Sequence, residues 1–138
     1  MDDNSRSFAL HEVSMERIAN NRIMIVGGDT HFSYLMQRYV RTSAHPLISA
    51  NLGDDILTLA RCERPAAIIL EVDLPETIGW HTLRALKTDQ EVSKIPVIVC
   101  SWLDEEARSL EQGANLYLRM PILYADFEAA LATVFLKG

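Results

Sequence analysis

The stretch "IILEVDLPETIGWHTLRALKTD", residues 68–89, combines the pattern of a buried strand with that of the helix that follows it. The apolar run that contains its start, "AAIILEV" (66–72), is continuous rather than alternating, as expected for a strand covered on both faces of a parallel sheet. Beyond Pro75, the residues Trp80, Leu83 and Leu86 repeat at helical spacing. A parallel strand that leads into a helix indicates an α/β fold, in which ligands meet the carboxyl ends of the strands.

The same alternation extends in both directions along the chain. Further apolar runs rich in β-branched residues are "RIMIVG" (22–27), "PLISA" (46–50), "IPVIVCS" (95–101) and "NLYLRM" (115–120). The helices between and after them have apolar positions at Phe32, Leu35, Met36, Tyr39 and Val40; Ile56, Leu57 and Ala60; Leu103, Ala107 and Leu110; and Leu123, Phe127, Ala130, Leu131 and Val134. Asp29 or Thr30 would cap the first of these helices, and Asp104 the fourth. The sequence therefore predicts (βα) five times over residues 22–137, folded by right-handed crossovers into a doubly wound sheet.

Composition restricts the class of protein further. The chain has 138 residues, 49% of them hydrophobic, which suits one domain with a full core. Its net charge of −6 argues against direct nucleic-acid binding. The apolar runs are far shorter than the roughly 20 residues of a membrane span. The start, "MDDNSRSFALHEV", lacks the basic and apolar regions of a secretory signal, so we expect a cytoplasmic protein.

Residues 1–21 are predicted to stand apart from a domain over residues 22–138. Their apolar residues could line a loose amphipathic helix, but polar interruptions leave a flexible lead-in equally open. Cys62 and Cys100 lack the spacing of a metal site, and buried reduced thiols are expected.

Three segments resemble the receiver domain of two-component response regulators. Residues 68–89 resemble its third strand, acceptor loop and third helix, and "KIPVIVCS" (94–101) its fourth strand, which ends in a hydroxyl residue. "GANLYLRMP" (113–121) resembles the Gly-Ala-x-x-Tyr-x-x-Lys-Pro signature of its fifth strand. The resemblance implies a flavodoxin-like, CheY-like fold with five parallel strands in the order 2-1-3-4-5. It also implies a cis peptide bond at Met120–Pro121.

In the receivers that this chain resembles, an aspartate after the third strand accepts a phosphoryl group, and two acids after the first strand hold Mg²⁺. A Ser or Thr and a Lys bind the phosphoryl oxygens, and an aromatic side chain moves with them. Carried over to this sequence, only the hydroxyl of Ser101 and the switch aromatic Tyr117 match. The acceptor position holds Glu71, the two metal-binding positions hold Gly27 and Gly28, and the lysine position holds Met120.

Each departure has a chemical consequence. The extra methylene of Glu71 displaces its carboxylate by about a bond length, and transfer chemistry tolerates about 1 Å poorly. Gly27 and Gly28 offer no side-chain ligands to a cation that dehydrates reluctantly. Met120 supplies no positive charge. We therefore expect a degenerate phosphoacceptor pocket with no catalytic residue and no cofactor, and with weak Mg²⁺ binding at most.

Two acids leave alternatives open. Asp73 could be a displaced acceptor, or could join Asp29 as a substitute Mg²⁺ ligand, but a solvated aspartate that caps the turn before Pro75 is favoured. Glu71 is either a partly buried acid with a raised pKa, or a side chain that reaches Ser101 and imitates a phosphorylated aspartate.

The stretch "GDTH" (28–31) also resembles the Asp-x-His-x-x-Gly element of cobalamin-binding domains. Tyr34 occupies the position of the final glycine and would crowd the corrin, so we expect His31 to be an exposed residue in the first turn of its helix.

The resemblance implies that the partner is a signalling protein, either a histidine kinase or an output protein. It would dock on the face formed by the fourth helix, fifth strand and fifth helix. A homodimer is a further option. The segment between Ser101 and Gly113 is about one helical turn shorter than in the family, which predicts either a shortened fourth helix or a tighter loop before it. Trp102 would either fill the vacated space, which is the expectation, or lie exposed as an interaction anchor.

Overall fold

The computed structural model describes residues 21–73 and 76–137. In this part of the chain five strands alternate with five helices. The strands are β1 (Ile23–Gly27), β2 (Leu47–Asn51), β3 (Ala67–Glu71), β4 (Val97–Ser101) and β5 (Leu116–Arg119). The helices are α2 (Thr30–Thr42), α3 (Ile56–Glu63), α4 (Glu76–Thr88), α5 (Glu106–Glu111) and α6 (Tyr124–Lys137).

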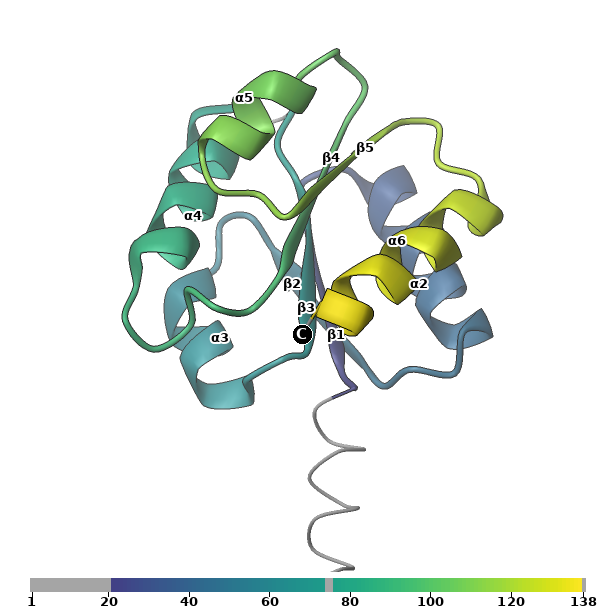
Figure 1. The fold of residues 1–138 in the computed structure, drawn as a ribbon, viewed down its shortest axis with the longest axis horizontal. Coiled ribbons are helices and arrows are strands. Elements are labelled where there is room, and N and C mark those ends of the chain that lie inside the picture. The colour runs from purple at the N-terminus through teal and green to yellow at the C-terminus, as the bar shows by residue number, and fades with distance from the viewer. Residues whose placement is uncertain (1–20, 74–75, 138) are drawn as a thin grey trace, which may run out of the picture.

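The strands form one parallel sheet in the order β2-β1-β3-β4-β5. Helices α3, α4 and α5 cover one face, and α2 and α6 cover the other (Figure 1). The predicted (βα)5 fold and its strand order 2-1-3-4-5 are confirmed.

Burial explains why the apolar runs are continuous. Every residue of the three central strands β1, β3 and β4 is buried, whereas the edge strands β2 and β5 are partly exposed. Side chains of alternating parity pack into two separate cores, one on each face of the sheet. A strand covered on both faces has no position that favours a polar residue, with the exceptions described below.

The first helix follows its predicted pattern. Asp29 is the N-cap of α2, and its side chain accepts a 2.9 Å hydrogen bond from the backbone N–H of His31. Phe32, Met36 and Val40 form the buried stripe of the helix. This cap fixes where the β1–α2 loop ends, and thereby positions one side of the candidate site.

The shortened fourth helix of the prediction is α5, which has six residues, but its details differ from the expectation. Glu105 rather than Asp104 occupies the N-cap position, and Leu103 and Leu110 are 58% and 49% exposed instead of facing a core. A contact between a charged side chain of α5 and an aromatic ring of α4 helps to hold this short helix in place. The guanidinium of Arg108 lies 4.0 Å from the ring centroid of Trp80 on α4.

Three further expectations concern single features. Cys100 is buried as predicted, but the prediction for Cys62 is wrong, because its position on α3 faces solvent. The predicted lead-in, residues 1–21, lies outside the described residues except for Asn21. Within residues 21–73 and 76–137, no helix has the length and apolar character needed to span a membrane.

Candidate functional site

The candidate site lies where β1, β3 and β4 end, at the carboxyl edge of the sheet. These three strands are neighbours, with Val26 opposite Leu70 and Glu71 opposite Cys100. The β1–α2 loop and the β4–α5 loop therefore flank the end of β3 on its two sides. The topology brings Gly27, Gly28, Glu71 and Ser101 to one place, as the sequence predicts.

Glu71 turns toward the β1–α2 loop. Its Oε1 accepts hydrogen bonds from the backbone N–H groups of Gly28, at 2.9 Å, and of Asp29, at 3.0 Å. The residue is only 2% exposed. Desolvation by burial raises the pKa of the Glu71 carboxyl above its usual value, opposed by the two backbone hydrogen bonds and assisted by the charges of Asp29 and Asp73.

Asp73 turns the other way, toward the β4–α5 loop. The Ser101 hydroxyl donates to Asp73 Oδ1 at 2.5 Å, and the Trp102 backbone N–H donates to Asp73 Oδ2 at 2.7 Å. Both carboxylate oxygens of Asp73 thus accept hydrogen bonds from a neighbouring loop, whereas the turn that Asp73 was expected to cap includes residues 74–75, which lie outside the described residues. The expected pairing of Glu71 with Ser101 is wrong, because the single hydroxyl proton of Ser101 is donated to Asp73.

Gly27 is enclosed by the first turn of α2. A Cβ added to Gly27 would lie 2.7 Å from Phe32 Cδ1 and 3.0 Å from Ser33 Oγ. Phe32 is itself 3% exposed and belongs to the core on this face of the sheet. The ring of Phe32 thus occupies space that a side chain at position 27 would need.

Met120 is part of the core rather than of a charged pocket. It is 7% exposed and packs in the cluster that covers the α2 and α6 face of the sheet. The peptide bond between Met120 and Pro121 is cis, as the resemblance implies.

The donors present do not match the Mg²⁺ site that the resemblance implies. Among residues 21–73 and 76–137, no group of three or more His, Cys, Asp or Glu side chains is placed to hold a metal ion. The side chain of Asp29 caps α2, and the carboxylate of Asp73 accepts hydrogen bonds from the β4–α5 loop.

The β4–α5 loop connects this pocket to Tyr117. Leu103 N–H donates to Ser101 Oγ at 2.9 Å, and the Tyr117 hydroxyl donates to the backbone carbonyl of Leu103. Glu105 N–H donates to the Tyr117 hydroxyl oxygen at 3.3 Å. Tyr117, predicted as the switch aromatic, is thus tied to the backbone of this loop.

Two contributions to the site escape sequence reasoning. The backbone N–H of Trp102 and the backbone of Leu103 take part through groups that every residue carries, so residue type gives no sign of them. The Trp102 side chain is 52% exposed, which corrects the expectation that it fills a gap. One signal for the contact of Asp73 was present in the sequence. The predicted strand order makes β3 and β4 neighbours, so residues just after β3 can meet residues 101–102 at the end of β4.

Trp102 borders an apolar cavity of about 460 Å³ next to the pocket. His31 and Tyr34 from α2 line another side of it, and Met120 and Pro121 line its base. His31 is exposed in the first turn of α2, as predicted.

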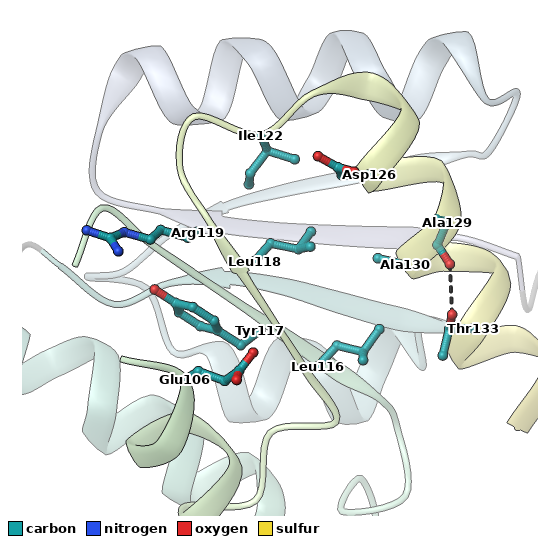
Figure 2. A pocket seen from close by; sticks show the side chains of 10 residues that line it. All are labelled: Glu106, Leu116, Tyr117, Leu118, Arg119, Ile122, Asp126, Ala129, Ala130 and Thr133. Carbon is teal, nitrogen blue, oxygen red and sulfur yellow. Dashed lines mark hydrogen bonds between the residues drawn. The ribbon is translucent and has the colours of Figure 1, made fainter. Parts of the chain in front are cut away.

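A separate groove of about 390 Å³ runs between α5, β5 and α6. Figure 2 shows the side chains that line it: Glu106 from α5, residues 116–119 of β5, Ile122 from the connecting loop, and Asp126, Ala129, Ala130 and Thr133 from α6. The lining combines the aliphatic side chains of Leu116, Leu118 and Ile122 with the charged side chains of Glu106, Arg119 and Asp126.

Comparisons with known proteins agree with this architecture. No protein-family model matches the chain. The chain is 32% identical over 116 residues to protein PilH of Pseudomonas aeruginosa, covering 82% of this chain and 93% of PilH. It is 31% identical over 108 residues to the polar-differentiation response regulator DivK of Brucella anthropi, covering 76% of this chain and 88% of DivK.

A solved structure of a putative response regulator from Chloroflexus aurantiacus matches the fold with a TM-score of 0.76 at 19% identity, covering 83% of this chain and 96% of that one. The chain belongs to the response regulator receiver family. It is a receiver domain of two-component signalling, a class of domain that interacts with signalling partners such as histidine kinases or output proteins.

Proposed function

We propose that this protein is an atypical receiver that acts without phosphorylation, as a protein–protein interaction module in signalling. It binds no metal ion tightly and catalyses no reaction. The observation that carries the proposal is the pair of carboxylates at the end of β3. Both accept hydrogen bonds from backbone N–H groups or from a hydroxyl of this chain.

Phosphoryl transfer depends on positioning and on neutralising charge. The residues at the end of β3 and in the β1–α2 loop favour neither the positioning nor the charge neutralisation. Glu71 Oε1 already accepts two N–H groups, and the positions that would carry metal ligands are Gly27 and Gly28. Met120 lies in the core, so the pocket gains no positive charge from the lysine position.

The test is intact-protein mass spectrometry after incubation with acetyl phosphate and Mg²⁺. We expect the mass of this protein to stay unchanged. The positive control is a phosphorylatable receiver, which should gain a phosphoryl group under the same conditions. A phosphoryl adduct on this protein would contradict the proposal.

A second candidate function is a phosphoryl-accepting receiver that uses Asp73. The hydrogen bond between the Asp73 carboxylate and Ser101 favours it, because Ser101 is the hydroxyl that the family directs at phosphoryl oxygens. Against it, both oxygens of Asp73 already accept hydrogen bonds. An adduct that is lost in Asp73→Ala and kept in Glu71→Gln would establish this alternative.

The docking surface proposed for the partner is the face of α5, β5 and α6. The groove in Figure 2 supports it, because a hollow lined by aliphatic and charged side chains suits the anchor side chain of a partner protein. The partner is a histidine kinase or an output protein, and a second copy of this chain would be a homodimer on the same face. The proposed compartment is the cytoplasm.

A further inference from the structure

The β4–α5 loop contains a small anion-binding arrangement. The Ser101 hydroxyl and the Trp102 backbone N–H are consecutive donors, and both point at one carboxylate. Hydrogen bonds that a hydroxyl and a backbone N–H donate to a carboxylate are charge-assisted. In this chain the anion is Asp73, two residues beyond the end of β3.

From this arrangement a continuous series of hydrogen bonds leads to the docking face. Ser101 Oγ donates to Asp73 and accepts from the N–H of Leu103 at 2.9 Å. The Leu103 carbonyl accepts the Tyr117 hydroxyl, whose oxygen accepts the N–H of Glu105 at 3.3 Å. Glu105 occupies the N-cap position of α5, and Tyr117 lines the groove between α5, β5 and α6.

We propose that Asp73 is a resident anion that fills the two-donor site of Ser101 and Trp102 and thereby holds the β4–α5 loop and Tyr117 in one arrangement. Asp73 is a positioning residue: it acts on the docking face through the loop and does not contact the groove. The inference deepens the proposed function and rests on it, because an internal anion makes an added phosphoryl group unnecessary for ordering this face.

The neighbouring charges are consistent with a carboxylate in this role. Arg119 Nε donates to the Trp102 carbonyl at 3.4 Å, which holds the same peptide segment from the β5 side. Glu71, the other acid at the end of β3, is bound by the amides of Gly28 and Asp29 and does not compete for Ser101. Each carboxylate therefore has its own pair of donors.

The experiment is residue-resolved amide hydrogen exchange by NMR on the full chain, with Asp73→Ala, Asp73→Asn and Glu71→Gln. In Asp73→Ala we expect the amides of Trp102, Leu103 and Glu105 to exchange at least about tenfold faster, and the ring resonances of Tyr117 to shift. Asp73→Asn keeps one acceptor oxygen and should give intermediate rates. Glu71→Gln, the matched control, should leave these three amides unchanged and affect only Gly28 and Asp29.

Unchanged protection of Trp102 and Leu103 in Asp73→Ala would overturn the proposal. So would faster exchange at Trp102 alone, with Glu105 and Tyr117 unaffected, because Asp73 would then be only a local cap. If Asp73→Ala does not fold, Asp73→Asn and Ser101→Ala supply the same comparison. The acetyl phosphate experiment tests the proposed function separately, since an adduct would refute that function and leave the exchange rates as they are.

Discussion

Glu71 and Asp73, two residues apart at the end of β3, direct their carboxylates to opposite neighbouring loops: Glu71 to Gly28 and Asp29 after β1, and Asp73 to Ser101 and Trp102 after β4. The two acids therefore join three adjacent strands across the carboxyl edge of the sheet. Hydrogen bonds within the chain thus link both flanking loops to the end of β3.

Glu71→Gln should raise the thermal midpoint of unfolding at pH 7. Burial raises the pKa of Glu71 in the folded protein above that of an exposed glutamate, so ionisation at neutral pH costs folding stability. The glutamine oxygen can still accept the N–H groups of Gly28 and Asp29.

The pH dependence identifies the cause. At a pH well below the usual pKa of a glutamate the wild-type carboxyl is protonated in both states, so the advantage of Glu71→Gln should disappear there and should grow as the pH rises toward the raised pKa of the folded protein. Thermal unfolding of both proteins across this range provides the measurement. A pH-independent difference would mean that packing, not ionisation, distinguishes them.

Gly27→Ala should reduce the free energy of unfolding by about 1–3 kcal/mol, because the new Cβ forces the buried Phe32 ring to move. The added atom would lie 2.7 Å from Phe32 Cδ1. Gly53→Ala is the matched control, since nothing lies within 4 Å of its added Cβ. Urea denaturation of the two variants should separate them, and equal midpoints would contradict the close packing at Gly27.

Arg108→Ala should lower the free energy of unfolding by about 0.5–2 kcal/mol through loss of its stacking on Trp80. Arg108→Lys keeps the charge that faces Glu105 but lacks the planar group, so it should recover little of this loss. Chemical denaturation compares the three proteins. Full stability of Arg108→Lys would show that charge alone fixes α5.

Ala129→Arg should weaken binding of the signalling partner at least about tenfold, because a long side chain would fill the groove of Figure 2. Ala129 is exposed, so the fold should tolerate the change. Ala132→Arg, also exposed on α6 but outside the groove, is the control. Affinity capture with each variant as bait gives the comparison, and sedimentation reports on a homodimer. Equal capture by both variants would exclude this face.

The sequence predicted the fold well because the fold depends on periodic, redundant signals. Continuous apolar runs marked the three buried strands, and the cap at Asp29 marked the start of α2. The site was predicted in position but not in contacts. Whether Glu71 contacts Ser101 or Gly28 depends on the direction of its side chain and on which backbone N–H groups lack another acceptor. Neither property can be predicted from the residue type. The exposure of Trp102 and Leu103 depends on where the six-residue helix α5 packs against the rest of the domain. The spacing of apolar residues in the sequence does not give that position.

The contact between Gly27 and Phe32 bears on how this protein could be re-engineered. A designer who wished to place an aspartate at position 27 would have to make room beside the aromatic ring at position 32, and would lose core packing by shrinking that ring. A side chain at position 27 and a smaller one at position 32 are therefore coupled substitutions.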